Sequence, residues 1–233
     1  MRFRVQDDFW TLFPDARIGI VVARGVNNHS EGHEDTTAQL DQAIAAAAAR
    51  LDGVDMPAHP AVAPWRQAYQ AFGMKPSKFR SSIESLLRSA QAGRLRSISP
   101  LVDVYNTVSL HHMLPCGGED LAHIQGDIRL TRATGGEPFR TIGAEKDEPP
   151  QPGEVIYRDD AGVICRAWNW RESDRTRLTE QTSDAFLCIE ALAVHGEAAL
   201  RAACDELAAL VSAQLGGTTR VELVSSARPA IDL

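Results

Sequence analysis

Residues Leu101 to Leu121 read LVDVYNTVSLHHMLPCGGEDL, a helical pattern that ends in a segment with two glycines. Ser99 and Pro100 precede it, and these residue types favour the cap and the first turn of a helix. The helix is expected to run to about Met113 and to stop at Pro115, because proline cannot continue a helix. The stretch therefore predicts a helix followed by a tight loop near the middle of the chain.

Polar side chains recur along one face of that helix. Asp103, Asn106 and Ser109 follow one another at helical spacing on a helix otherwise rich in valine and leucine. The amide of Asn106 supplies a donor and an acceptor suited to an α-amino or carbonyl group, and Ser109 lies one turn further on. The alternative is that both side chains satisfy nearby backbone groups.

Cationic residues gather before this helix, between Trp65 and Arg96. They are Arg66, Lys75, Lys78, Arg80, Arg88, Arg94 and Arg96, and Glu84 is the single acid among them. Two helices are expected here, the second beginning at Pro76 and ending at Gly93. On the second helix Arg80, Glu84 and Arg88 recur every four residues, so the acid should lie between two cations.

The net charge of −7 argues against nucleic-acid binding by the whole surface. An acidic protein with one cationic region can still contact a phosphate backbone on one side. We define Lys75, Lys78, Arg80 and Arg88 as the basic belt and expect it to bind RNA, with no binding to DNA. The alternatives are a solvated helix face and, for Arg80, an ion pair with Glu84.

Strand patterns dominate the second half of the chain. The first half, before the basic belt, holds one strand pattern, Arg17 to Arg24 (RIGIVVAR), which is typical of a buried strand. A helix is expected after it, because Thr36 and Gln39 have the spacing of a capping box, and this helix should end near Gly53. Further strands are expected at 124–132, at 154–170 as a hairpin, at 182–191 and at 219–225, with a helix at 196–215. This grouping predicts an α+β fold of mixed and antiparallel strands with helices packed on one side.

Composition is that of an ordinary globular protein. The chain has 233 residues, of which 44% are hydrophobic and 24% charged, and this suits one domain over residues 1–233. No apolar run approaches the roughly 18–20 residues of a membrane span, and the N-terminus MRFRVQDDFW lacks the apolar core of a secretory signal. Four widely spaced cysteines predict free thiols, a cytoplasmic location and no metal site. No cofactor is expected.

Two stretches carry a resemblance to a known family. The first stretch, residues 101–121, has a VD-x-x-N core, a proline shortly after the helix and a D-L ending. The second stretch, residues 153–192, has a hairpin, a turn with Glu172, the motif T-x-x-T and a strand that ends in an acid. In this order the motifs resemble the tRNA-editing (B3/4) domain of the phenylalanyl-tRNA synthetase β subunit. The likeness is strongest over residues 60–225, and the basic segment FGMKPSKFRSSIESLLR is typical of freestanding members.

The resemblance implies the fold of the editing domain and a deacylase that hydrolyses the ester of a mischarged aminoacyl-tRNA in trans. It implies that Asn106 and Glu172 are catalytic and that an aminoacylated tRNA is the partner. The expected substrate-binding residues are Ser109, Gly117, Gly118, Trp170 and Arg171. A pocket should therefore lie between the helix at 101–113 and the segment 168–177.

Two places depart from the family pattern. Gly117 stands where the synthetase has a histidine, and Trp170 and Arg171 precede Glu172 where the synthetase has a glycine-rich turn. Both changes fall on the part of the pocket that would hold the amino-acid side chain. The tyrosyl ester, which the synthetase domain chiefly clears, is therefore expected to be a poor substrate.

Two other functions fit the same residues. One is a non-catalytic module, related to the same β subunit, that binds tRNA or a free amino acid. The other is a small-molecule hydrolase with Cys116 as nucleophile, although an unpaired cysteine is more often a small buried hydrophobe. An aminoacyl ester is already activated, so positioned water and hydrogen bonds to the developing oxyanion can suffice without a triad.

Reversing two charges of the basic belt, as in the double variant Lys75→Glu and Lys78→Glu, is expected to weaken tRNA binding. The salt dependence of binding should also become flatter, because fewer counterions are released. Fluorescence anisotropy with labelled tRNA across a salt series measures both effects. Unchanged affinity at low salt would show that the belt is an ordinary solvated face.

Overall fold

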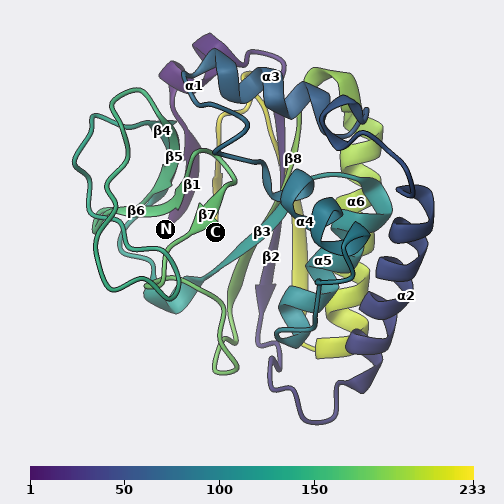
Figure 1. Cartoon of the computed structure of the whole chain (residues 1–233). Coiled ribbons are helices and arrows are strands. Elements are labelled where there is room, and N and C mark those ends of the chain that lie inside the picture. Colours follow the sequence, from purple (N-terminus) through teal and green to yellow (C-terminus); the bar gives the residue numbers. More distant parts are fainter.

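The computed structural model describes residues 1–233 as two sheets with helices around them (Figure 1). The helices are α1 (Asp7–Leu12), α2 (Glu34–Arg50), α3 (Ala63–Ala71), α4 (Ser82–Gln91), α5 (Pro100–His112) and α6 (Glu197–Leu215). The strands are β1 (Arg2–Val5), β2 (Arg17–Arg24), β3 (Cys116–Asp120), β4 (Ile128–Arg132), β5 (Val155–Arg158), β6 (Val163–Arg166), β7 (Arg171–Glu172), β8 (Ala185–Ala191), β9 (Thr218–Val224) and β10 (Ala230–Asp232).

The two sheets differ in how their strands pair. The six-stranded sheet, with the order β10-β1-β4-β5-β6-β7, is mixed, because β1 and β4 run parallel while its other pairs are antiparallel. The four-stranded sheet, β3-β8-β2-β9, is antiparallel throughout. Phe3 pairs with Ile231, which brings the two chain ends together in Figure 1. The predicted α+β class with mixed and antiparallel strands is confirmed.

The four-stranded sheet is buried on both faces. Along β2 and β8, Ile20 and Phe186 contact the core between the two sheets, whereas Val21 and Leu187 contact a second core under α5 and α6. This division follows from the alternation of side chains along a strand. Gly19 lets α6 approach closely, since a Cβ there would lie 2.1 Å from the Cys204 sulfur. Thus α5 and α6 cover one face, α2 packs against α5, and the six-stranded sheet lies on the other face (Figure 1).

Several local predictions are confirmed and two are wrong. Strand β2, the β5–β6 hairpin, β8 and α6 lie where their patterns predicted them. Helix α2, however, begins two residues before Thr36, whose hydroxyl donates to the His33 carbonyl at 2.8 Å, so no capping box forms. Gly117 and Gly118 lie in β3, paired with β8, and not in a loop.

Helix α4 also begins later than predicted. Pro76 lies in the preceding turn, and the helix starts after Ser81, whose hydroxyl accepts a hydrogen bond from the Glu84 N–H at 3.3 Å. Serine is a favoured N-cap because its side chain satisfies one of the unpaired N–H groups of the first turn. The first residue of the helix, Ser82, donates its N–H to the Asn169 side chain at 3.2 Å.

A strained turn follows β6. Ala167 and Trp168 have φ angles of 44° and 64°, which residues with a Cβ rarely adopt. The Glu154 carboxylate fixes this turn, because it accepts the Ala167 N–H at 2.9 Å and two hydrogen bonds from the Arg166 guanidinium at 2.9 Å. Both members of this ion pair are buried, with side-chain exposures of 7% for Arg166 and 0% for Glu154.

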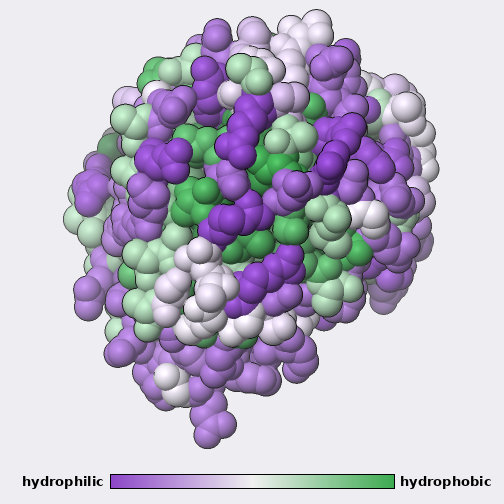
Figure 2. Space-filling model, turned by 180° about the vertical axis from the view of Figure 1, so that it is seen from behind, coloured by the Kyte–Doolittle hydropathy of each residue, from purple (hydrophilic) through white to green (hydrophobic).

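The surface is mainly hydrophilic. In the view from behind, apolar residues gather near the centre of the face within a ring of hydrophilic ones (Figure 2). The large hydrophobic residues that are well exposed are Met1, Ile98, Ile142 and Val194. None of the helices combines the length and the apolar character needed to cross a bilayer.

Replacing Glu154 with glutamine is expected to lower the free energy of unfolding by about 3 kcal/mol, because the Arg166 charge then lies buried without its counter-ion. Urea unfolding of the whole chain measures this change. Asp232→Asn is the matched control: it breaks the exposed pair with Arg2, which should contribute less than about 1 kcal/mol. Equal losses in the two variants would contradict the role assigned to the buried pair.

Candidate functional site

A cavity of about 400 Å³ lies between the two sheets. Its walls come from β3 and β8 on one side and from β5, β6 and β7 on the other, with Ser82 of α4 and the segment 168–171 at its ends. Aromatic rings of Tyr157, Trp168, Trp170 and Phe186 line it. Three carboxyl groups, from Glu119, Glu172 and Glu190, also line it. Apolar walls with a few polar groups are typical of small-molecule sites.

Glu172 is held against the edge strand of the four-stranded sheet. Its Oε1 atom accepts a hydrogen bond from the Gly118 N–H at 3.4 Å. Burial raises the pKa of Glu172 to about 7, and the Gly118 N–H opposes that shift. The carboxylate needs the space left by glycine at 117, because a Cβ there would lie 3.1 Å from Oε1. A carboxyl group with a pKa near neutrality can both give and accept a proton.

Glu190 lies deeper and is fully hydrogen-bonded. Its two oxygens accept hydrogen bonds from the Tyr157 hydroxyl and the Asn169 amide, each at 2.7 Å. Burial raises the pKa of Glu190 to about 7, although these two donors favour the charged form. Asn169 in turn accepts hydrogen bonds from the Tyr69 hydroxyl at 3.0 Å and the Ser82 N–H at 3.2 Å. This network fixes α3 and the start of α4 to the cavity wall.

Glu119 completes the set of carboxyl groups. Its side chain lines the cavity and is 5% exposed, yet its buried Oε2 atom has no hydrogen-bond partner. Burial raises the pKa of Glu119 well above its ordinary value, and the neighbouring charge of Glu172 raises it further. Sequence analysis missed Glu119 and Asn169, because neither stands at a position that the motifs single out.

The structure brings together five of the seven residues that were predicted to be catalytic or to bind the substrate. Glu172, Gly117, Gly118, Trp170 and Arg171 all line the cavity. The segment 168–177 therefore supplies one wall, as predicted.

Helix α5 does not supply the other wall. Asn106 and Ser109 are absent from the lining, and the Ser109 hydroxyl donates to the Leu114 carbonyl at 2.6 Å. The expected pocket between α5 and the segment 168–177 is wrong in this respect, because α5 packs on the outer face of the four-stranded sheet and the cavity lies at the inner face. We therefore assign no contact with substrate to either residue.

The basic belt lies beside the cavity. Lys75 and Lys78 are exposed, whereas Arg80 and Arg88 approach the buried Glu84 at 3.9 and 2.9 Å. Thus the predicted position of the acid between two cations is confirmed. The ring of Phe79, next to Lys78, packs against Trp170 at 4.6 Å between centroids, and Trp170 lines the cavity.

Arg171 forms the rim of the cavity. Its guanidinium carbon lies 4.5 Å from the centroid of the Trp170 ring, a cation–π contact. Trp170 is partly exposed and Arg171 is exposed, so both can contact a molecule that enters from solvent.

The four cysteines are free, as predicted. Cys116 is buried, and burial raises the pKa of its thiol well above the ordinary value. A raised thiol pKa disfavours the thiolate that nucleophilic catalysis requires. No group of three or more His, Cys, Asp and Glu side chains has an arrangement that could hold a metal ion.

Comparisons with known proteins give one family. A family model described as the B3/4 domain matches residues 64–212. The chain is 37% identical over 93 residues to the phenylalanine–tRNA ligase β subunit of Ruegeria pomeroyi, covering 40% of this chain and 11% of that protein. It is 31% identical over 115 residues to the same subunit of Cereibacter sphaeroides, covering 49% and 14%. The chain thus matches little more than a tenth of the length of these relatives.

One solved structure can be aligned with most of this chain. It is an N-terminal fragment of the phenylalanyl-tRNA synthetase β subunit from Pyrococcus horikoshii, with 14% sequence identity and a TM-score of 0.48. The alignment covers 94% of this chain and 50% of that one.

The variant Glu172→Gln is expected to change how stability depends on pH. The pKa of Glu172 rises from 4.5 to about 7 on folding. The contribution of this group to the free energy of unfolding is therefore complete below pH 4.5 and is lost as pH rises through 7. Glutamine cannot ionise, so the unfolding free energy of the variant minus that of wild type should rise by about 1–3 kcal/mol between about pH 5 and 8.

Urea unfolding at several pH values measures this difference. Glu31→Gln removes a carboxyl group from an exposed position and controls for the loss of one charge. A difference between Glu172→Gln and wild type that does not change with pH would contradict the buried setting of Glu172.

Proposed function

We propose, because this chain belongs to the B3/4 domain family, that it hydrolyses the ester of a mischarged aminoacyl-tRNA in trans. The observation that carries the proposal is the cavity between the sheets, in which Glu172 lies with a pKa of about 7. An α-ammonium and an ester need a small, partly polar site that opens to solvent, and the cavity offers this. Such an enzyme would act in the cytoplasm, where aminoacyl-tRNAs are used.

Glu172 is the general base in this mechanism. Its carboxylate takes a proton from a water molecule as the water oxygen attacks the ester carbonyl carbon. The tetrahedral intermediate collapses, the bond to the ribose oxygen breaks, and that oxygen receives the proton, which releases the amino acid and the uncharged tRNA. A base with a pKa of about 7 suits reaction near neutral pH.

The tRNA end approaches over the rim. The partly exposed ring of Trp170 offers a face on which the terminal base can stack. Lys75 and Lys78 lie in the turn that leads to Phe79, which touches Trp170, so we expect them to contact the phosphates near the end of the same tRNA strand. Arg80 and Arg88 contribute less to RNA binding, because they are engaged with Glu84.

Glu172→Gln is expected to slow single-turnover deacylation by about a hundredfold while tRNA affinity stays nearly unchanged. The reason is that Glu172 acts on the reacting atoms, whereas the phosphate backbone supplies most of the affinity. The assay uses a panel of mischarged tRNAs, with Glu31→Gln and Cys116→Ser as controls that should retain the wild-type rate.

Three results would each contradict one part of this account: the hydrolysis itself, the role of Glu172 as the base, or the expected side-chain specificity. If no aminoacyl-tRNA is cleaved but tRNA still binds, the chain is a binding module. If Cys116→Ser abolishes hydrolysis, the nucleophile is the thiol. If tyrosyl-tRNA is cleared efficiently, Trp170 and Arg171 do not restrict the side-chain end of the site.

A further inference from the structure

The cavity is lined by three carboxyl groups, and none of them forms an ion pair with a cation of the protein. Glu119, Glu172 and Glu190 line it from β3, β7 and β8, and Arg171 is the single cationic residue in the lining. Arg171 is exposed at the rim and stacks on Trp170. The remaining titratable groups of the lining are the Tyr157 hydroxyl and the thiols of Cys116, Cys165 and Cys188.

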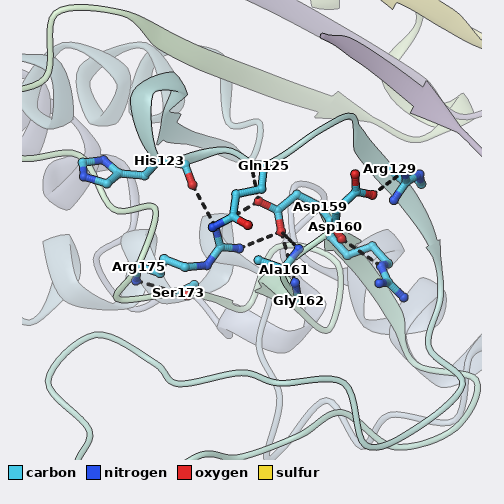
Figure 3. A network of polar contacts seen from close by, with 10 residues as sticks. His123, Gln125, Arg129, Asp159, Asp160, Ala161, Gly162, Ser173 and Arg175 are labelled. Atoms are coloured by element: carbon cyan, nitrogen blue, oxygen red, sulfur yellow. Dashed lines mark hydrogen bonds and ion pairs between the residues drawn. The ribbon is translucent and has the colours of Figure 1, made fainter.

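The buried Arg166 and the half-buried Arg175 are already engaged with other carboxylates. Arg166 forms its ion pair with Glu154. Arg175, which lies near Glu119, donates to both oxygens of the buried Asp159 carboxylate at 2.9 and 2.7 Å (Figure 3). Asp159 also accepts the backbone N–H groups of Gln125, Ala161 and Gly162, so this network fixes Arg175 in place (Figure 3).

Glu119 is the group most in need of a partner. Glu190 has a donor on each oxygen, and Glu172 accepts the Gly118 N–H. Glu119 is 5% exposed, lines the cavity and leaves its Oε2 atom without a hydrogen bond, although the nearby Thr176 hydroxyl and the Arg175 charge favour its ionised form. A buried polar group without a partner is costly, and a ligand that donates to it gains the interaction.

We propose that the cavity selects aminoacyl groups with a cationic side chain, of the lysine class, and that the Glu119 carboxylate receives the side-chain ammonium. This inference rests on the proposed function. Glu172 is engaged with the attacking water in the proposed mechanism, so a side-chain ammonium needs a carboxylate of its own. The rings of Tyr157, Trp168 and Phe186 pack against the methylene stem between the two charges.

The proposal explains why buried carboxyl groups persist in this cavity. A bound cation favours the ionised form of each carboxyl group, so binding releases protons at any pH where these groups are protonated in the free protein. A neutral side chain of the same length would leave Glu119 without a partner and would bind less well. Glu119 is thus a specificity-determining residue, separate from the base Glu172.

Binding of amino-acid amides tests the inference without requiring hydrolysis. Isothermal titration of the full chain with lysinamide, norleucinamide and tyrosinamide compares side chains on a common α-ammonium. Lysinamide is expected to bind at least about tenfold more tightly than norleucinamide, and this preference should shrink as the pH is lowered and Glu119 takes up a proton. Norleucinamide or tyrosinamide binding as tightly as lysinamide would overturn the inference.

Glu119→Gln removes the charge and keeps the shape. It should reduce the preference for lysinamide to less than about threefold, whereas the exposed control Glu31→Gln should keep it. A preference that survives in Glu119→Gln would overturn the role of Glu119. Thermal unfolding shows whether that variant folds. If it does not, titration of the wild-type protein with the three amides still tests whether the cavity prefers a cationic side chain.

The two proposals fail in different ways. Amide binding with a preference for lysinamide, but no cleavage of any aminoacyl-tRNA, would overturn the deacylase and keep the specificity. Cleavage of a panel of aminoacyl-tRNAs without faster turnover of the lysyl ester would keep the deacylase and overturn the specificity.

Discussion

The buried carboxylate of Glu154 holds the turn on which the cavity depends. It accepts the Ala167 N–H and two hydrogen bonds from Arg166, and it thereby stabilises two non-glycine residues at positive φ. Such backbone is strained and persists only where its surroundings fix it. Because the chain turns there, Trp168 enters the core between the sheets, while residues 169–172 line the cavity.

The ionisable groups inside the cavity differ from those near its rim. Apolar and aromatic walls lower the local dielectric response, so carboxyl groups in the cavity hold their protons up to about pH 7, as the pKa values of Glu172 and Glu190 show. Outside, exposed lysines lie beside the rim, on a protein whose net charge is −7. A site with carboxyl groups inside and lysines at its edge suits a ligand with a cationic end, whose binding favours the ionised carboxylates, and a phosphate backbone. An aminoacylated tRNA has both features.

The periodicity of apolar residues in the sequence predicted the positions of helices and strands better than it predicted how they pack together. The apolar run of β2 and the β5–β6 hairpin have strong local patterns, and the structure confirms them. Glu172 was found through its motif. Glu119 was missed, because its burial arises only when β3 pairs with β8 and the two sheets close over it. Asn106 was placed in the pocket because of its motif, but the four-stranded sheet separates the α5 core from the cavity, which residue spacing does not report.

The most direct test of the account is a crystal structure of the protein with a non-hydrolysable aminoacyl-adenosine in which an amide replaces the ester. The account predicts the aminoacyl group between the two sheets, its carbonyl carbon beside Glu172 and its adenine over Trp170 at the rim. Binding of the analogue on the α5 face, or anywhere outside the cavity between the sheets, would contradict it.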